Sequence, residues 1–377
     1  MNVPKLRFKE FTDEWKKVEL DKLYEFKNGL NGDRSLYGKG VELINVSDIL
    51  NNTYITSKVI NGKININENT LRKNSVEYGD ILFQRSSETF LEIGTSNVYL
   101  DNKIVTFSGF VIRGKRKKYN INNPLFINYV LKSPTLRKKI IICGSGAQHY
   151  NIGQEDLKRI TIFLPSIKEQ KKIADMLELL DKKIELQTKK IEALKLFKLC
   201  ILKHIFSSAT VKIKLKDVSN IVKGKQINSE ELSKSGSYYM LNGGTEPSGY
   251  LEKYNTLENT ITISEGGNSC GYVKYNKCKF WCGGHCYSLE NKLINNHYLY
   301  QLLKFNEKKI MRLRIGSGLP NIQKKDLENF ELFIHEKDNQ YKIANLLMKY
   351  DTKIELEKNK LDKLALLKIG LLQNMFI

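Results

Sequence analysis

The 377-residue chain lacks any long run of apolar residues and has few of the side chains that most enzymes depend on. Its longest apolar runs, such as residues 140–143, are far shorter than the roughly 18 residues that a transmembrane helix needs. It contains only 5 His, and no Ser or Cys stands in a recognisable triad setting. The sequence therefore argues against a membrane-spanning protein and against a triad hydrolase.

Acidic residues are also scarce, because 41 Asp and Glu face 62 Lys and Arg and leave a net charge of +21. Such an excess attracts polyanions and makes nucleic acid the first candidate partner, although ribosome-associated and peripheral membrane proteins can be equally basic. The N-terminal segment carries charges where a signal peptide would be apolar, so we expect a cytoplasmic protein with reduced cysteines. With 41% apolar residues, the chain can form two or three folded domains.

The chain contains an internal repeat. Residues 151–206 align without gaps on residues 321–376 at a constant offset of 170, with 21 of 56 positions identical. Upstream, the Gly-Ser-Gly of residues 144–146 returns at residues 316–318, two residues out of that register, which we attribute to a longer loop in the first copy. A fainter similarity opens each half. The sequence thus predicts two tandem units.

The first part of each unit has the pattern of a β-rich domain. Short β-type runs at residues 41–46, 80–84 and 260–264 are separated by Gly and Asn clusters. A short apolar strand is expected at residues 160–164 and again at 330–334, just before the last part of each unit.

The last part of each unit has the pattern of a long helix. Residues 169–206 contain no Gly or Pro, and apolar side chains recur at alternating spacings of four and three residues, which is typical of a coiled coil. Both copies interrupt the seam with polar residues at the same places, namely Gln187 and Glu357, and Lys198 and Lys368. The predicted seam positions include Ile173, Leu177, Leu180, Ile184, Ile191 and Leu194 in the first copy and Ile343, Leu347, Tyr350, Ile354, Leu361 and Leu364 in the second.

Together these patterns predict an α+β protein made of units 1–207 and 208–377. Each unit would consist of a β-rich domain followed by a long helix, and the two helices would pair as an antiparallel coiled coil that holds the units apart. The alternative is that each helix packs on its own domain. The expected boundaries are 1–165 for the first domain, 166–207 for the central helix, 208–335 for the second domain and 336–377 for the C-terminal helix.

The motifs of nucleotide and metal chemistry are incomplete. The glycine-rich residues 266–271 lack the Lys and Ser or Thr of a P-loop, and residues 123–126 have only one of the two prolines expected in a DNA amino-methyltransferase. Four cysteines gather at Cys270, Cys278, Cys282 and Cys286, beside His285. Their spacings lack the close pair of a zinc knuckle, so we favour packing in a β core over a zinc site. We therefore expect no cofactor or metal in this chain.

Several polar segments are suited to nucleic acid. Gln84 and Arg85 can make bidentate contacts with adenine and guanine edges, and Ser86 and Ser87 follow them. Lys115, Arg116, Lys117 and Lys118 belong to a run that we expect to form a cationic hairpin loop, suited to phosphates or simply solvated. In the second unit, Asn242, Glu265, Asn268 and Tyr272 lie in glycine-supported loops, for which ordinary β-turn chemistry is the alternative. The loops that hold Gln148 and His149, and Asn321 in the second copy, offer backbone amides to a phosphate.

These residues give the sequence its resemblance to the specificity subunit of a type I restriction-modification enzyme. The opening around Pro4, Leu6 and Trp15 is similar to the family's usual start, and residues 164–174 resemble its signature before the first conserved helix. The second copy departs from that signature at His335 and Asn339, while Gln340, Ile343 and Ala344 remain.

The resemblance implies two target recognition domains that each read one half of a bipartite duplex DNA sequence. It implies a chain without catalysis of its own, which docks two modification subunits that use S-adenosylmethionine and then restriction subunits that use ATP and Mg. Two alternatives are a protein-binding scaffold whose basic charge is incidental, and the specificity region of a larger fused enzyme. The second is disfavoured because the chain starts at its own methionine and lacks a catalytic module.

Overall fold

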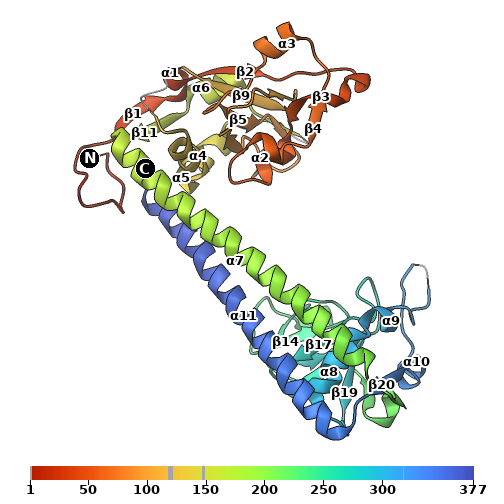
Figure 1. Ribbon diagram of the computed structural model, residues 1–377. Helices are drawn as coiled ribbons and strands as arrows, with labels where there is room; N and C mark the ends of the chain where they lie inside the picture. The colour runs from red at the N-terminus through yellow and green to blue at the C-terminus, as the bar shows by residue number, and fades with distance from the viewer. Residues whose placement is uncertain (1, 118–121, 147–148, 317) are drawn as a thin grey trace. The chain divides into compact units, whose positions relative to one another are not determined.

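The computed structural model describes residues 2–117, 122–146, 149–316 and 318–377, and the chain divides into two compact units (Figure 1). Unit 1 consists of Met1–Thr188 together with Lys360–Ile377, and unit 2 of Lys189–Asn359. The division therefore falls inside the two long helices, α7 (Ile167–Ser207) and α11 (Lys337–Asn374), and not at the predicted boundary after residue 207. Each unit holds the beginning of one long helix and the end of the other.

The core of unit 1 is a four-stranded sheet in the order β2-β9-β5-β7. The central strand β5 is buried on both faces, because Ile81 and Phe83 pack with helix α4 while Leu82 points into a second apolar cluster. That second cluster lies between the sheet and the small sheet β4-β3-β8. The elements are β2 (Tyr24–Asn28), β3 (Tyr37–Ile44), β4 (Gly62–Ile64), β5 (Ile81–Gln84), β7 (Ser96–Val98), β8 (Thr106–Phe107), β9 (Val111–Arg116), α1 (Leu20–Leu23), α2 (Val46–Leu50), α3 (Glu68–Lys73), α4 (Pro124–Lys132) and α5 (Pro134–Ile142).

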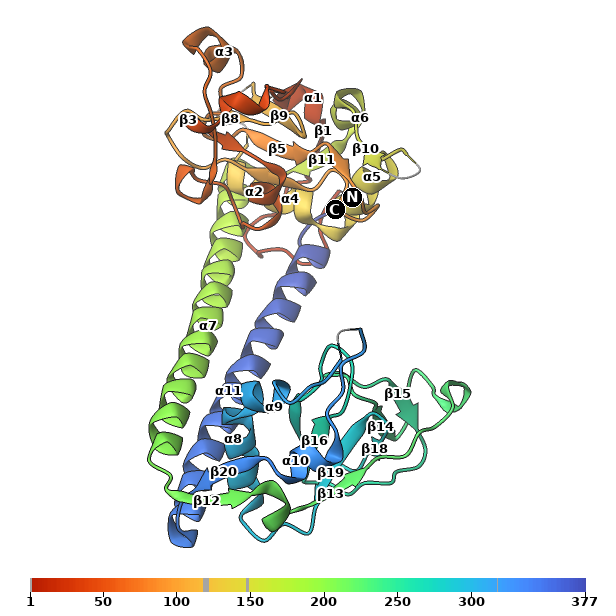
Figure 2. The ribbon, with the colours of Figure 1, turned by 90° about the vertical axis from the view of Figure 1, so that its right-hand side faces the viewer.

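Unit 2 repeats this plan with the sheet β13-β19-β16-β17. Its central strand β16 places Ile261 and Ile263 against helix α8, which Figure 2 shows beside α11. A small sheet, β15-β14-β18, takes the place of β4-β3-β8. The elements are β13 (Asn220–Lys223), β14 (Tyr238–Leu241), β15 (Gly249–Leu251), β16 (Thr260–Ser264), β17 (Val273–Asn276), β18 (Trp281–Cys282), β19 (Cys286–Glu290), α8 (Asn296–Phe305) and α9 (Glu307–Met311).

The strands predicted before the long helices are present in both units. In unit 1, β11 (Thr161–Leu164) pairs antiparallel with β1 (Lys16–Glu19), and in unit 2, β20 (Glu331–Ile334) pairs antiparallel with β12 (Val211–Lys214). Short helices precede them, α6 (Gln154–Arg159) and α10 (Lys324–Glu328). No helix within the described residues is both long and apolar enough to span a membrane.

The two long helices pair antiparallel, and in each unit a Lys-Asp contact marks the pairing. In unit 1, Lys368 Nζ of α11 lies 2.5 Å from Asp181 Oδ1 of α7, whose other oxygen accepts a hydrogen bond of 2.8 Å from the Tyr129 hydroxyl of α4. In unit 2 the roles of the helices are exchanged. Lys198 Nζ of α7 lies 2.5 Å from Asp351 Oδ1 of α11, whose other oxygen accepts a hydrogen bond of 2.6 Å from Gln301 of α8.

These contacts explain the polar positions in the predicted seam. Lys198 and Lys368, which interrupt the apolar pattern at the same place in each copy, are the residues that reach the aspartates. Glu357 likewise accepts from Lys190 at 2.9 Å. A buried charge is tolerated only opposite its partner, so polar residues in a seam select one register.

All the predicted apolar seam positions are buried or half-buried, as expected for the helix pair. The first turns of each helix also pack on a β-rich body. Ile173 and Leu177 join the core of unit 1, and Ala344 and Leu347 join the core of unit 2. The alternative of packing on the domain therefore describes the start of each helix. The end of each helix packs on a body as well, because Leu202 of α7 joins the core of unit 2 and Leu371 of α11 packs against the core of unit 1, and the paired seam lies between these ends.

The Lys-Asp contact in unit 1 yields a stability prediction. We expect Asp181→Ala to lower the free energy of unfolding by about 1–3 kcal/mol, because Lys368 and Tyr129 both lose their partner at a largely buried site. Urea denaturation provides the measurement. The control is Lys182→Ala on the same helix, whose exposed ammonium pairs with Glu178 and should contribute clearly less than the Asp181 contacts. Equal losses for both variants would contradict the proposed importance of Asp181.

Lys132 of α4 yields a pH prediction. Burial lowers its pKa to about 7, the nearby Lys368 lowers it further, and Asp181 partly opposes this. Its ammonium donates to Thr53 O at 2.7 Å. Between the folded pKa and the ordinary lysine pKa, the unfolded chain binds more protons, so stability should rise from pH 7 to pH 9 by at most about 1.4 kcal/mol per pH unit.

Lys132→Met should flatten this rise, and denaturation curves of both proteins at several pH values would measure it. Identical pH slopes for the variant and the parent would show that Lys132 keeps an ordinary pKa.

Candidate nucleic-acid interface

The residue that follows the central strand in each unit lies at the centre of the candidate site. In unit 1 this residue is Arg85. Its backbone N–H donates to Phe110 O at 2.9 Å, and its carbonyl accepts from Ile152 N at 3.0 Å. Asn28, the last residue of β2, lines the same place, as does Asn151. Three segments far apart in the sequence thus meet where β5 ends.

Unit 2 builds the same arrangement around Glu265. Its backbone N–H donates to His285 O at 2.9 Å, and its carbonyl accepts from Ile322 N at 2.8 Å. Lys223, the last residue of β13, reaches Glu265 through its side chain. We call these places the strand-end corners, formed by Asn28, Arg85, Phe110 and Asn151 in unit 1 and by Lys223, Glu265, His285 and Asn321 in unit 2.

The corner of unit 1 presents a cationic donor. The half-buried Arg85 side chain donates from one guanidinium nitrogen to Gly109 O at 3.3 Å, which steadies it at the edge of a depression of about 600 Å³. Glu155 and Asp156 of α6 form part of the same wall. An arginine in this setting has further N–H groups that can donate to a pair of acceptors.

The corner of unit 2 presents an anionic acceptor. Glu265 Oε1 receives Lys223 Nζ at 2.6 Å and the Tyr287 hydroxyl at 3.0 Å, and its side chain is 12% exposed. His285 Nδ1 lies 3.9 Å from Oε2, which has no hydrogen-bond partner among the described residues. Burial raises the pKa of Tyr287, so its hydroxyl remains a donor to the carboxylate. One oxygen of Glu265 is therefore buried in the corner without a donor from the described residues.

The loops next to the two corners have the same length, which corrects an expectation from the sequence. Ser145 and Asn151 exchange two backbone hydrogen bonds of 3.0 and 2.8 Å, and Ile315 and Asn321 exchange two of 2.8 and 3.0 Å. The longer loop expected in the first copy is therefore wrong. The glycines with positive φ, Gly146 and Gly316, are equivalent. The two copies differ only in where the Gly-Ser-Gly sequence falls within the loop. His149 and Asn321 are exposed, and Gln148 lies outside the described residues.

The expected accessible amide at Gln84 is wrong. Gln84 is the last residue of β5, is only 4% exposed, and donates from its side chain to Ser86 O at 3.0 Å. Ser86 and Ser87 form the short strand β6 (Ser86–Ser87), which pairs with β10 (Tyr150–Asn151). Strand alternation turns Gln84 inward and leaves Arg85 at the surface.

The expected cationic hairpin loop is also wrong. Residues 111–116 form β9, which lies inside the main sheet between β2 and β5. Arg116 is buried and donates to Asn122 Oδ1 at 3.0 Å, and Lys115 is paired with Glu77 at 3.0 Å. Lys117 lies near Asp21 at 3.5 Å, while Lys118 lies outside the described residues. The charged run is engaged in pairs because acceptors just before β5, in α1 and after β9 lie beside it.

The other predicted residues of unit 2 lie around Glu265 or serve its loops. The Asn242 side chain accepts the His285 backbone N–H at 3.0 Å, so it holds the backbone of a corner residue in place. Asn268 is exposed in the loop after β16. Tyr272 is half-buried and lies under Lys304, whose ammonium is 4.2 Å from the ring centroid. Only Glu265 and Asn321 of the predicted residues in this unit belong to the corner itself.

Three of the four clustered cysteines belong to the interior of unit 2. Cys282 and Cys286 pack with Leu241 and Phe280, Cys270 is also buried, and Cys278 is exposed. Within the part of the chain that the structure describes, no three His, Cys, Asp or Glu side chains are grouped as a metal site would need.

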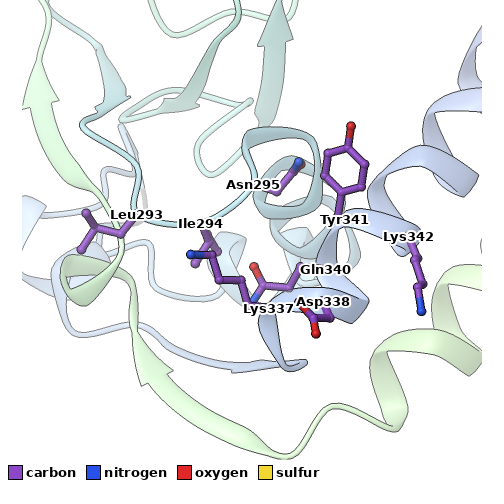
Figure 3. A pocket seen from close by; sticks show the side chains of 8 residues that line it. All are labelled: Leu293, Ile294, Asn295, Lys337, Asp338, Gln340, Tyr341 and Lys342. Carbon is purple, nitrogen blue, oxygen red and sulfur yellow. The ribbon is translucent and has the colours of Figure 1, made fainter.

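A second depression, of about 710 Å³, lies at the start of α11 in unit 2 (Figure 3). Leu293 and Ile294 from the segment before α8 line it together with Gln340 and Tyr341 from α11. At the equivalent start of α7 in unit 1, Arg7 donates to Glu169 at 2.7 and 2.8 Å and covers that helix start. The depression is bounded by a helix start, whereas the corner follows the central strand, so the two are separate features.

Five corner residues, Asn28, Phe110, Asn151, Lys223 and His285, were not among the predicted site residues. The helical repeat has an offset of 170, but Arg85 and Glu265 differ by 180, and Phe110 and His285 by 175. Different loop lengths thus hide the equivalence from alignment. The only signal of this equivalence in the sequence is local: an aromatic residue follows a glycine in both turns, as Gly109-Phe110 and as Gly284-His285.

Comparison with known proteins gives a consistent result along the chain. A family model described as the type I restriction modification DNA specificity domain matches residues 12–196 and again residues 208–366. A putative type I specificity subunit of Mycoplasma genitalium is 34% identical over 140 residues, which are 36% of this chain and 36% of that protein. A putative type I restriction enzyme specificity subunit of Methanocaldococcus jannaschii is 22% identical over 405 residues, covering 96% of this chain and 93% of that one.

Solved structures resemble the fold over its whole length. The crystal structure of the S subunit of a type I restriction-modification system from M. genitalium has a TM-score of 0.67 at 20% identity and covers 100% of this chain and 99% of that chain. A chain from work on complex assembly and conformational transition of the type I R-M system has a TM-score of 0.58 at 15% identity, with 96% and 97% covered. At these identities the likeness concerns the fold.

Proposed function

Because the chain belongs to the family of type I restriction-modification DNA specificity proteins, we propose that it is a DNA-binding subunit that reads a bipartite duplex sequence and catalyses no reaction itself. One observation carries this proposal. The strand-end corner is built twice with the same backbone hydrogen bonds, but Arg85 occupies the central position in one unit and Glu265 in the other. A constant frame with exchanged side chains is suited to reading two different half-sites.

The chemistry of the two central side chains matches opposite base edges. A guanidinium can donate two hydrogen bonds to O6 and N7 of guanine in the major groove, whereas a carboxylate accepts from the N4 amino group of cytosine. Arg85 therefore favours guanine in the half-site of unit 1, and Glu265 favours cytosine in the half-site of unit 2. The net charge of +21 supports duplex DNA as the partner. The surrounding cations would offset the repulsion between the Glu265 carboxylate and the DNA phosphates.

Phosphate contacts are assigned to lysines beside the corners, since the β9 residues are engaged inside unit 1. Lys324 and Lys325 are exposed in α10, which follows Asn321 and Ile322 directly. These contacts would position the protein without choosing a sequence.

The exposed faces of the long helices support docking of two copies of one partner. Apolar side chains recur at equivalent positions of both helices, with Leu186 67% and Leu356 55% exposed, and Leu196 64% and Leu366 67% exposed. Unit 1 holds Leu186 and Leu366, and unit 2 holds Leu356 and Leu196, so each unit presents the same pair with the helices exchanged. Apolar surface of this kind marks protein interfaces.

We assign these faces to two modification subunits that bring S-adenosylmethionine, and we assign ATP and Mg to restriction subunits that join the complex.

In this chain the Asn-Pro pair that resembles part of a methyltransferase motif has a structural use. The Asn123 side chain accepts the Phe126 N–H at 2.9 Å and caps α4, and Pro124 is the first residue of that helix.

Base selection tests this proposal. The full chain with its modification subunits is used to select duplexes from a random pool, and the enriched sequences should contain two fixed blocks separated by unspecified bases. Arg85→Ala should relax one position of one block, with a loss of discrimination of about 1–3 kcal/mol, and Glu265→Ala should relax one position of the other block.

The matched control is Arg72→Ala, which also removes a cation from unit 1 but changes a residue on α3 whose pair with Glu68 is fully at the surface. It should leave both blocks unchanged. A pool without enrichment would favour the protein-binding scaffold, and relaxation of both blocks by Arg85→Ala would contradict separate readers.

A further inference from the structure

An exposed aromatic ring stands beside Arg85 in unit 1. Phe110 is 66% exposed, although a phenylalanine is among the residues that gain most from burial. It occupies the third position of a turn from Ser108 to Val111, closed by a hydrogen bond of 2.9 Å from Val111 N to Ser108 O. The ring therefore projects from the tip of a tight turn between β8 and β9.

This turn is held rigidly on the strand-end corner. The Phe110 carbonyl accepts the Arg85 N–H at 2.9 Å, and the preceding carbonyl of Gly109 accepts from the Arg85 guanidinium at 3.3 Å. Ser108 N donates to Ile44 O at 3.0 Å. A side chain at position 109 would collide with Asn31, so the glycine allows this close approach. Phe110 and Arg85 thus share one fixed platform, and binding would cost little ordering entropy.

Unit 2 presents a different ring from the same platform. Its turn runs from Gly283 to Cys286 and is closed by a hydrogen bond of 3.0 Å from Cys286 N to Gly283 O. The ring at the tip is His285, whose side chain is 64% exposed and whose carbonyl accepts the Glu265 N–H at 2.9 Å. The tip position therefore varies between units together with the central position.

We propose that Phe110 is a specificity-determining residue of unit 1 that packs against the C5 methyl group of a thymine next to the base contacted by Arg85. This inference rests on the proposed function. The thymine methyl is the one apolar group among the base edges in the major groove, and apolar contact with a side chain such as Phe is how it is read. Because Arg85 reads guanine in that same groove, the ring beside it faces the neighbouring base pair.

His285 in the same place can donate or accept a hydrogen bond, so the tip of unit 2 is suited to a polar base edge instead. The pair of residues at central and tip positions then defines two neighbouring bases in each half-site. For unit 1 this pair predicts guanine beside a base pair that contains thymine.

The test removes the methyl group alone. In the selected duplex, each thymine of the half-site read by unit 1 is replaced in turn by uracil, and binding of the full chain with its modification subunits is measured. At one position the parent should lose affinity about fourfold, the effect of one methyl-sized apolar group. Phe110→Ala should lose at least the same factor on the thymine duplex and show no further loss with uracil there.

Three variants make the test specific. Phe110→Leu keeps an apolar side chain and should retain part of the thymine preference at the same position. Tyr78→Ala removes another ring of unit 1 that is 47% exposed. Tyr78 precedes β5, whereas the strand-end corner lies where β5 ends, so this variant should keep the full thymine preference. His285→Ala should likewise leave the half-site of unit 1 unaffected.

The inference is overturned if the parent tolerates uracil at every position, or if Phe110→Ala keeps the thymine preference while still reading both half-sites. Loss of a bound modification subunit in Phe110→Ala, with unchanged base preferences, would assign the ring to a protein interface and also overturn it. Failure of the parent to distinguish any duplex sequences would instead contradict the proposed function.

Discussion

The contact between a lysine of one long helix and an aspartate of the other is the interaction on which the rest of the molecule depends. Lys368 with Asp181 in unit 1, and Lys198 with Asp351 in unit 2, are half-buried charges in largely apolar seams. A shift of one helix by a single turn would leave both charges without partners, which is far more costly than the loss of an exposed pair. Each aspartate also accepts from its own body, through Tyr129 or Gln301, so the helix register and the position of the body are set by the same carboxylate.

Because each unit is anchored in the same way, its sheet can vary without disturbing the helices. The strand-end corners keep their backbone hydrogen bonds while the central side chain changes from Arg85 to Glu265 and the tip ring from Phe110 to His285. Surface side chains on a rigid frame can be exchanged at little cost in stability, whereas the frame itself is buried. This separation accounts for a protein whose two halves share a fold and differ in what they contact.

The helices and strands were predictable because their signals are local and repeated. Heptad spacing, the missing glycine and proline, and the duplicated polar positions at Lys198 and Lys368 identify the helix pair, and alternation identifies strands such as residues 260–264. The location of the charged residues 113–116 was not predictable in this way. Their partners, Glu77, Asp80 and Asn122, are brought to β9 by the sheet, and only those pairs turn a seemingly solvated run into an internal strand.

The candidate site was partly predictable for a related reason. Arg85 and Glu265 were found as polar residues at strand ends, but their equivalence depends on insertions of different length on each side, which no constant offset can align. Phe110 and His285 were missed because exposure, and not residue type, makes them notable.

Photocrosslinking from the two tips tests the central claim most directly, namely that each strand-end corner contacts one half of a bipartite DNA target. A photoreactive phenylalanine analogue is placed at position 110 in one protein and at position 285 in another, and the crosslinked base is mapped on the selected duplex. The account predicts a crosslink from position 110 within one half-site and from position 285 within the other. Crosslinks from both positions to the same half-site, or to the unspecified bases between the blocks, would contradict it.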